Sequence, residues 1–320
     1  MPLYMDHHHK VEGLTAEAVA GAHQRDLEVQ AKHGVKFWPM SAAREPRDLV
    51  AEIEAFPSLP RGSGERFAGY SVMGLPFTSG HILALRRFPA SSVGPPFRSV
   101  WHRDPSGRWT FFQDVPSVQG CARYFGAAVA EVVAATIEIA WDGPRRFSVT
   151  VTGSGRRLDW SLTLTSSAIT RVMSSIGSLL PAAVWRQRLF LAGMGMVAGP
   201  MMRAGKVRLE GLTPNGQRFV ANPLLLWLVA DSEATLDGVD LGAVGSSPTP
   251  GRLEDFWIPQ RGVFAIGKAF FTTAQADDAD AEQRVESPSS AESARGQEHD
   301  LARGDPVHGR AWVPKPGGTG

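Results

Sequence analysis

Residues 97–113 read FRSVWHRDPSGRWTFFQ, and this stretch decides the class of fold. The sequence Asp104-Pro105-Ser106-Gly107 suits a type I turn, which favours Asp at its first position, Pro at its second and Gly at its fourth. If Asp104 pairs with Gly107, Trp101 lies opposite Thr110 in the hairpin that the turn closes. Large aromatic residues fall on both faces of this hairpin, so we expect it to be covered on both sides. Such a hairpin is typical of the wall of a barrel or sandwich with a lined interior.

The same alternation of apolar and polar residues runs through the middle of the chain. It predicts strands at 137–141, 147–151 and 158–164, with Asp142-Gly143-Pro144 turning the chain between the first two. Thr213-Pro214-Asn215-Gly216 is a further hairpin signal. Turns at short, regular intervals indicate antiparallel meanders. The sequence therefore predicts a mainly β chain (α+β overall), built as a large antiparallel β barrel or sandwich that is lipocalin-like by analogy.

One stretch, at about 168–200, breaks this alternation and has helical spacing instead. Pro181 suits the first turn of a second helix within this insertion. An amphipathic stripe on that helix is expected at Trp185, Leu189, Ala192 and Met196. We expect the helical insertion to pack against the sheet or to cap it.

Composition divides the chain into four parts: an N-terminal segment at 1–40, a linker at 41–64, a β-rich domain at 65–271 and a tail at 272–320. The linker is expected to hold a short helix between Arg47 and Ala55. The tail carries 9 acidic and 5 basic residues and few apolar ones. Because it cannot bury enough apolar surface to offset its chain entropy, we expect it to be disordered.

The overall composition argues against several classes of protein. With 33 basic and 32 acidic residues among 320, the net charge of +1 does not suit a strongly basic nucleic-acid binder. The single cysteine, Cys121, excludes a disulfide framework and a cysteine-based zinc cluster. The longest apolar stretch, 189–202, is shorter than the roughly 20 residues of a membrane-spanning helix, and the N-terminus lacks the pattern of a signal peptide. We therefore expect a cytoplasmic protein with no nucleic-acid partner and no stable membrane insertion.

The N-terminal segment is rich in histidine. Residues 2–9 alternate as a strand and include the run His7-His8-His9. A helix predicted for 16–33 presents His23 and Asp26 on one face. Imidazole and carboxylate ligands brought together in this way suit a borderline divalent ion such as nickel or zinc.

Four short stretches of this segment resemble a known family. Residues 1–6 (MPLYMD), 11–17 (VEGLTAE), 22–27 (AHQRDL) and 34–37 (GVKF) are similar to the opening of small actinobacterial nickel-binding proteins. The resemblance implies a ferredoxin-like fold and a nickel cofactor. The positions that match the family's polar pattern, and so imply metal ligands, are Asp6, His8, His23 and Asp26. The chain leaves the family's pattern at Trp38-Pro39, so the resemblance implies an incomplete ferredoxin-like β-α segment at 1–40.

In the β-rich domain, tryptophans on predicted strands suit the wall of a ligand cavity. They are Trp101, Trp109, Trp141 and Trp160. The leading hypothesis is therefore a binding protein, not an enzyme, that takes up an apolar or amphipathic small molecule in a cavity inside the barrel. His102 beside Asp104 suits a general base, which leaves a cofactor-free isomerase or hydratase as one alternative. Binding of nickel or another divalent metal by the N-terminal segment is the other alternative.

Two further features are interpreted as structural. The arginine pairs at 86–87, 145–146 and 156–157 fall near strand ends and turns, where solvated side chains are the usual case and contact with an anionic ligand is the alternative. Cys121 is expected to be buried and inert, as most lone thiols are.

Overall fold

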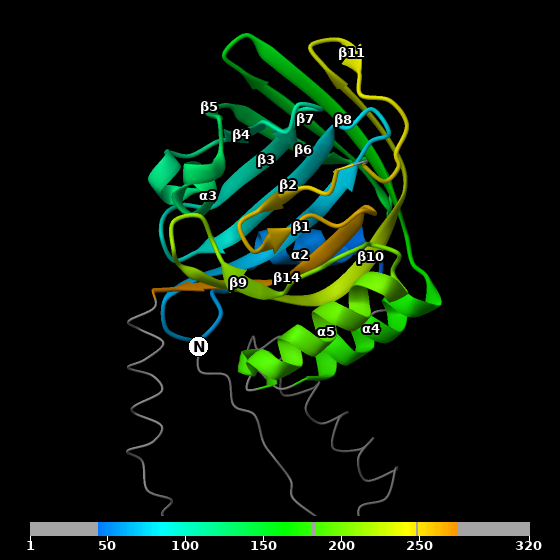
Figure 1. Ribbon diagram of the computed structural model, residues 1–320. Coiled ribbons are helices and arrows are strands. Elements are labelled where there is room, and N and C mark those ends of the chain that lie inside the picture. Colours follow the sequence, from blue (N-terminus) through cyan, green and yellow to red (C-terminus); the bar gives the residue numbers. More distant parts are fainter. Residues whose placement is uncertain (1–43, 181–183, 248, 274–320) are drawn as a thin grey trace, which may run out of the picture. The chain divides into compact units, whose positions relative to one another are not determined.

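A computed structural model of the chain describes residues 44–180, 184–247 and 249–273. The segment at 1–40, with the expected nickel ligands, lies outside the described residues, and so do Pro181 and the tail from residue 274 onward. By contacts between Cα atoms the chain divides into two units, Met1–Phe271 and Thr272–Gly320, and nearly all described residues belong to the first. They form a β-rich body with helices on its surface (Figure 1).

One large sheet contains nearly all the described strands. Its strands are β1 Glu65–Pro76, β2 Ile82–Ser91, β3 Phe97–Arg103, β4 Trp109–Gln113, β5 Glu131–Ala134, β6 Thr136–Trp141, β7 Arg146–Gly153, β8 Arg156–Thr165, β9 Glu210–Leu212, β10 Arg218–Leu236, β11 Val239–Asp240 and β14 Val263–Thr272. A separate hairpin consists of β12 Arg252–Leu253 and β13 Phe256–Trp257. The helices are α2 Pro46–Ala55, α3 Ala122–Phe125, α4 Ala168–Leu179 and α5 Arg188–Met201, with 3-10 turns at Ser117–Gln119, Gly126–Ala128 and Val184–Arg186.

The large sheet curls into a nearly closed barrel. Its strand order is β5-β4-β3-β2-β1-β14-β10-β8-β7-β6, and β9 and β11 pair with β10. The two end strands of this path, β5 and β6, follow one another in the chain and are joined by Ala135, whose amide donates to the Gln113 carbonyl of β4 at 3.0 Å. The prediction of a mainly β, largely antiparallel barrel is confirmed, although β4 and β5 run parallel. Along the path the described strands follow one another in sequence order, from β1 to β5 and from β6 through β7, β8 and β10 to β14, which pairs with β1. The lipocalin-like part of the prediction stays an analogy.

Buried apolar side chains fill the interior of the barrel. They come from every strand along the path and include Val72, Leu85, Val100, Phe112, Val133, Ile137, Phe147, Trp160, Trp227 and Phe264. Helix α2, at the position predicted for the short helix, adds Leu49 and Val50 to this cluster. The contiguous interior cluster indicates that the nearly closed barrel surrounds a packed core.

A second apolar layer covers the opposite face of β1–β4. It contains Phe67, Ala84, Phe97, Trp101, Phe111, Tyr124, Phe125, Phe219, Phe256 and Phe271. The side chains that cover this face belong to α3, β13 and the first part of β10. The expectation that the hairpin at 97–113 is covered on both sides is therefore confirmed.

The register predicted for that hairpin is wrong by one residue. The Gly107 amide does bond to the Asp104 carbonyl at 2.9 Å, as the expected type I turn requires. Gly107 then adopts a φ of 92°, a left-handed conformation, and Asp104 pairs with Arg108. This three-residue loop with a glycine bulge is a common hairpin connection. It sets Trp101 opposite Phe111, and the two rings stack with centroids 4.4 Å apart.

The predicted helical insertion is confirmed as α4 and α5. Ser167 caps α4 through its side chain, in a capping box with Thr170. The predicted buried stripe on the second helix is wrong, because Trp185 is buried in the 3-10 turn before α5, whereas Met196 on α5 is 73% exposed. The predicted stripe required one continuous helix, but the chain breaks between the 3-10 turn and α5, so the two residues do not share a helix face. Among the described residues no helix is both long and apolar enough to cross a lipid bilayer.

The close packing of α4 on β10 yields a stability prediction. A Cβ at Gly177 would lie 2.7 Å from the Leu224 carbonyl oxygen, so Gly177→Ala forces the helix away from the sheet. We expect a net loss of about 1–2 kcal/mol in urea unfolding, after the helix-propensity gain of alanine is included. Gly193→Ala on α5 is the matched control, because a Cβ there meets no atom within 4 Å. Equal stability of the two variants would contradict this close packing of α4 on β10.

Candidate binding site

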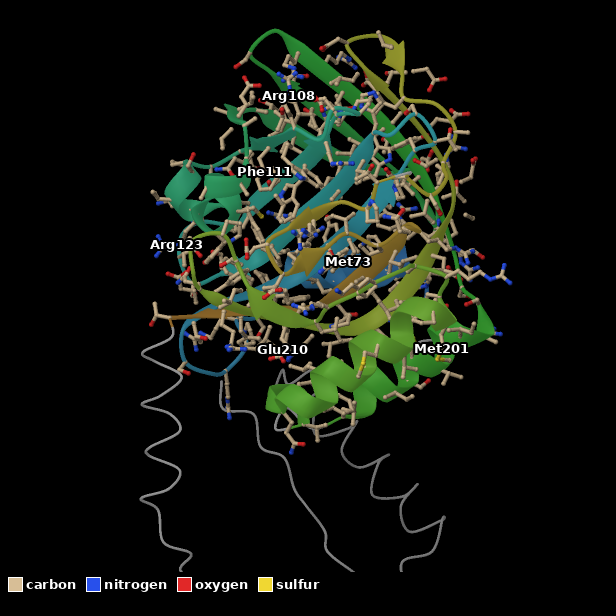
Figure 2. All side chains as sticks on the ribbon, in the orientation of Figure 1. Met73, Arg108, Phe111, Arg123, Met201 and Glu210 are labelled. Carbon is tan, nitrogen blue, oxygen red and sulfur yellow. The ribbon has the colours of Figure 1, made fainter. Side chains whose placement is uncertain are left out.

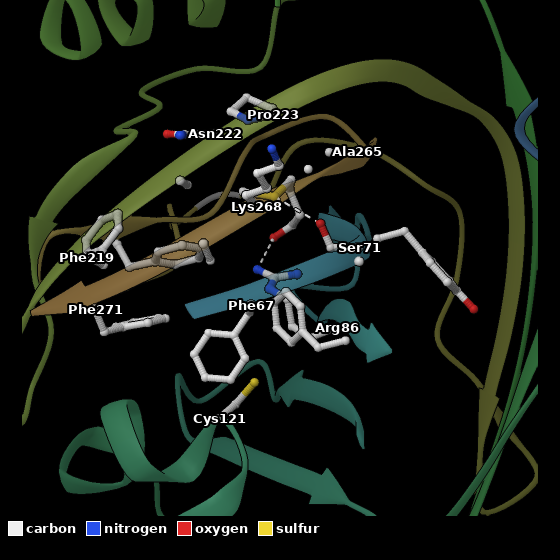
Figure 3. A pocket seen from close by; sticks show the side chains of 18 of the residues that line it. Phe67, Ser71, Arg86, Cys121, Phe219, Asn222, Pro223, Ala265, Lys268 and Phe271 are labelled. Atoms are coloured by element: carbon white, nitrogen blue, oxygen red, sulfur yellow. Dashed lines mark hydrogen bonds between the residues drawn. The ribbon is translucent and has the colours of Figure 1, made fainter. Parts of the chain in front are cut away.

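The candidate site is an aromatic pocket on the face of the sheet that points away from the barrel interior. It lies against β1, β2 and β14 and has a volume of about 80 Å³ (Figure 3). Its apolar wall includes Phe67, Phe88, Phe97, Trp101, Tyr124, Phe125, Phe219, Phe256 and Phe271, and its polar lining includes Ser71, Arg86, Asn222 and Lys268. The lining contains two basic residues and no acidic one. An apolar pocket with a few polar groups is the usual form of a small-molecule site.

The alternation of β2 places Arg86 in this pocket. Leu85 and its neighbours of the same parity point into the barrel, so Arg86 points to the outer face. Its guanidinium donates to the carbonyl oxygens of Val72 at 2.6 Å and Met73 at 3.2 Å, and to its neighbour Leu85 at 2.8 Å. The guanidinium carbon lies 4.5 Å from the centre of the Trp101 ring. Backbone oxygens and an aromatic face therefore hold this side chain in place.

The charge of Arg86 has no described carboxylate beside it. The side chain is only 5% exposed, and burial lowers its pKa to about 10, which still leaves it charged at neutral pH. The adjacent Arg87 points to the other face, where Glu54 receives its Nε and Nη2 at 2.8 and 2.6 Å. Among residues 44–180, 184–247 and 249–273 no such ion pair is found for Arg86. The expectation that both arginines are solvated is wrong, since the curled sheet buries both of its faces here.

Two further polar groups line the pocket. Lys268 on β14 is partly buried, and burial lowers the pKa of its amine. Asn222 on β10 is 6% exposed, and its Oδ1 is buried with no hydrogen-bond partner among the described residues. A buried amide oxygen without a partner is unusual and marks a place where a ligand donor can bind.

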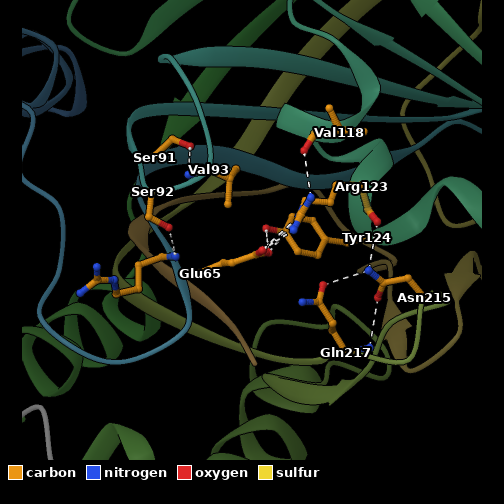
Figure 4. A network of polar contacts seen from close by, with 10 residues as sticks. Glu65, Ser91, Ser92, Val93, Val118, Arg123, Tyr124, Asn215 and Gln217 are labelled. Carbon is orange, nitrogen blue, oxygen red and sulfur yellow. Dashed lines mark hydrogen bonds and ion pairs between the residues drawn. The ribbon is translucent and has the colours of Figure 1, made fainter. Parts of the chain in front are cut away.

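A network of polar contacts fixes the edge of the pocket (Figure 4). Glu65 at the start of β1 accepts from Arg123 at 2.5 Å and from the Tyr124 hydroxyl at 2.5 Å. Burial alone would raise the pKa of Glu65, but these two donors outweigh it and hold the pKa below its usual value. The amide of Asn215, in the turn before β10, donates to the Tyr124 carbonyl at 3.2 Å. The Tyr124 ring stacks on Phe271 at 3.7 Å, so the network holds one wall of the pocket in position.

Of the four tryptophans expected to line a cavity, Trp101 lines this pocket. Trp109 is buried in the same outer layer, away from the pocket lining. Trp160 lies in the barrel interior, where its Nε1 donates to Ser232 at 2.9 Å, and Trp141 packs against Phe147 at the edge of that interior. The structure thus separates the four residues between two faces of the sheet.

His102 and Asp104 do not form the expected pair. Asp104 accepts from Ser106 and from the backbone and side chain of Arg108, and these bonds hold its pKa well below its usual value. His102 contacts His81 instead: the distance from His102 Nε2 to His81 Nδ1 is 2.9 Å, and the two rings are stacked. Neither histidine lines the aromatic pocket.

Three other features of the described residues were considered as possible ligand sites. The described residues hold no group of three or more His, Cys, Asp or Glu side chains that could bind a metal. A second hollow, of about 730 Å³, lies beside α5, but its lining mixes both signs of charge from Lys206, Arg208, Glu210 and Asp255. Cys121 lines the aromatic pocket and is buried as expected, and burial raises the pKa of its thiol to about 11.

Comparisons with known proteins identify no family for the chain. No family model matches the sequence, and no curated protein matches it. One similar solved structure is an acetoacetate decarboxylase from Legionella pneumophila subsp. pneumophila str. Philadelphia 1. It shares 9% sequence identity with this chain at a TM-score of 0.31, and the alignment covers 70% of this chain and 92% of that one.

The histidine pair yields a prediction on pH. Burial, followed by the charge of His81, lowers the pKa of His102 from 6.5 to about 4. Between these values the unfolded chain binds more protons than the folded one, so stability falls as the pH falls from 6.5 to 4, by up to about 3 kcal/mol. Denaturant unfolding of the wild type and of His102→Gln at several pH values measures this loss. The variant should lose distinctly less stability over that range, and identical pH dependence would contradict the interpretation.

Proposed function

We propose that the protein binds a small amphipathic anion, an apolar acid, in the aromatic pocket. The observation that carries the proposal is Arg86, a buried cation at an apolar wall without a described counter-ion. A ligand carboxylate would supply the missing negative charge, and its apolar part would contact the aromatic rings. This is the hypothesis of apolar or amphipathic ligand binding, moved from the barrel interior to the outer face of the sheet.

The contrast between Arg86 and Arg87 supports an anionic ligand. Both side chains come from β2 and both are buried, but only Arg87 has its charge balanced within the described chain. Isolating a charge from water is costly unless a partner compensates for it. Three carbonyl oxygens and the Trp101 ring offset part of this cost for Arg86. A bound carboxylate would offset more of it through charge-assisted hydrogen bonds.

The other polar groups fit the same ligand class. Lys268 adds a second positive charge to the lining, and no acidic side chain of the lining opposes it. Asn222 offers an amide that can accept from a ligand hydroxyl or, turned over, donate to a carboxylate. A volume of about 80 Å³ suits a short acid better than a long fatty acid. We therefore infer a ligand with one acidic group and a compact apolar part.

A matched set of probes tests the proposal. Calorimetric titration with hexanoate, hexanol and hexylamine keeps the apolar part constant and changes only the charge. We expect hexanoate to bind most tightly, by about tenfold or more over hexanol, since a hydrogen bond to a charged group contributes about 1.5–3 kcal/mol. Quenching of Trp101 fluorescence gives a second readout, because this ring lies beside Arg86.

Variants assign the effect to the pocket. Arg86→Met removes the charge while keeping a side chain that fills the same space, and should reduce hexanoate affinity to the level of hexanol. Arg108→Met is the control, because that side chain is 76% exposed at a distant turn. Thermal melts establish that the Arg86 variant is folded, and Lys268→Met provides a second test if it is not. Equal affinity for hexanoate and hexanol in the wild type would refute the proposal.

A further inference from the structure

Helix α4 packs on the sheet with its small and polar side chains. Thr170 is 0% exposed and Ser174 is 2% exposed. The Ser174 hydroxyl accepts from the Leu226 amide of β10 at 2.9 Å, and Gly177 lies too close to Leu224 for any side chain. Beside Met173, which packs against the apolar cluster shared with β10, small and polar side chains therefore occupy much of the face that usually carries the largest apolar side chains of a surface helix.

Three large apolar side chains of α4 are exposed at the surface. Ile169, Val172 and Ile176 follow one another at helical spacing and are 36%, 56% and 47% exposed. Helix α5 adds the exposed side chains of Met196 and Val197, and Met201 lies at its end (Figure 2). Both helices pack on β10 through shared apolar clusters, so their free faces lie on the same side of the body (Figure 1). Clustered exposed apolar side chains of this kind mark an interaction surface.

The segment that contains these helices carries basic residues only, although Glu210 and Asp255 lie in the hollow beside α5. From residue 160 through residue 209 the sequence contains no Asp or Glu and six basic residues, Arg171, Arg186, Arg188, Arg203, Lys206 and Arg208. Arg171, Arg203 and Lys206 are exposed, and no ion pair is found for them among the described residues. Arg208 has an acidic partner, Asp255. Exposed apolar side chains flanked by unopposed cations are complementary to a membrane surface that carries anionic lipids.

We propose that α4 and α5 dock the protein onto an anionic lipid bilayer, with the apolar side chains at the level of the headgroups and the basic side chains beside lipid phosphates. The helices lie on the bilayer and do not cross it. The acidic tail at 272–320 is a poorer occupant, because its densest acidic stretch, 277–286, contains only one large apolar residue, Val285. It offers charge to this face but little apolar cover. The proposal is independent of the ligand of the aromatic pocket.

Flotation of the full chain with vesicles tests the proposal. We expect binding to vesicles of phosphatidylcholine with phosphatidylserine, weaker binding at high salt, and little binding to phosphatidylcholine alone. Val172→Glu should reduce binding to the mixed vesicles more than tenfold, because it places a charge in the apolar face and adds repulsion from the lipid. Arg171→Glu and Arg203→Glu, made singly and together, should each reduce binding to the mixed vesicles at least fivefold, because each removes a cation.

Control variants separate docking from general effects of charge. Val239→Glu changes a valine that is 67% exposed on β11, away from the helices, and Arg146→Glu changes an exposed arginine at the turn between β6 and β7. Both should bind the mixed vesicles like the wild type. Equal binding to neutral and anionic vesicles, or unchanged binding of Val172→Glu, would overturn the proposal.

Failure of the wild type to bind anionic vesicles would overturn it as well, and sedimentation then identifies the occupant. A dimer that Val172→Glu dissociates would assign the apolar face to a second copy of the chain.

Discussion

In β2 the side chains of Leu85, Arg86 and Arg87 point alternately to the two faces of the sheet, as the pleat of a strand requires. In most antiparallel sheets one of these faces meets water. Here the curled sheet encloses one face, and α3, the β12–β13 hairpin and the start of β10 cover the other. Every residue of β2 from Ile82 to Arg87 is therefore buried. This constraint places a charged side chain in an apolar layer, and the aromatic pocket is built around it.

Arg86 and Arg87 are both buried by this double coverage of β2, but their charges are compensated in different ways. On the interior side Glu54 of α2 balances Arg87, and the Tyr70 hydroxyl donates to the same carboxylate at 3.0 Å. On the outer side carbonyl oxygens and rings surround Arg86, and the charge stays unbalanced within the described chain. Buried ion pairs contribute little net stability, but a buried charge without a partner is strongly unfavourable. A protein that keeps such a charge gains from it when an anion binds, and this is why the pocket, and not the packed barrel interior, is the stronger site.

Much of the architecture follows from local sequence patterns. The hairpins around Asp142 and Thr213, the helix at 46–55 and the helical insertion all carry turn or periodicity signals that act over a few residues. The site depends on contacts that such patterns do not encode. The bulge at Gly107 shifts one strand by one residue and so moves Trp101 onto Phe111. His102 contacts His81 because β2 and β3 pair, and the proximity of Asp104 in the sequence does not predict that pairing. The burial of Arg86 depends on segments more than 100 residues away, such as β13, which no local pattern around residue 86 indicates.

Helix α4 shows a different limit of pattern analysis. Its spacing predicts a helix equally well whichever face packs on the sheet, and the apolar side chains at Ile169, Val172 and Ile176 would ordinarily be assigned to the core. The close approach to Leu224 and Leu226 excludes that arrangement, because only Gly177 and Ser174 leave room for the strand and satisfy its backbone. Covering an exposed valine or isoleucine gains about 1.5–3 kcal/mol at full burial, so three such side chains in a row represent a substantial unused free energy. With no acidic residue within the same 50 positions of the sequence to attract a basic partner, the surface is suited to one that is apolar and negatively charged.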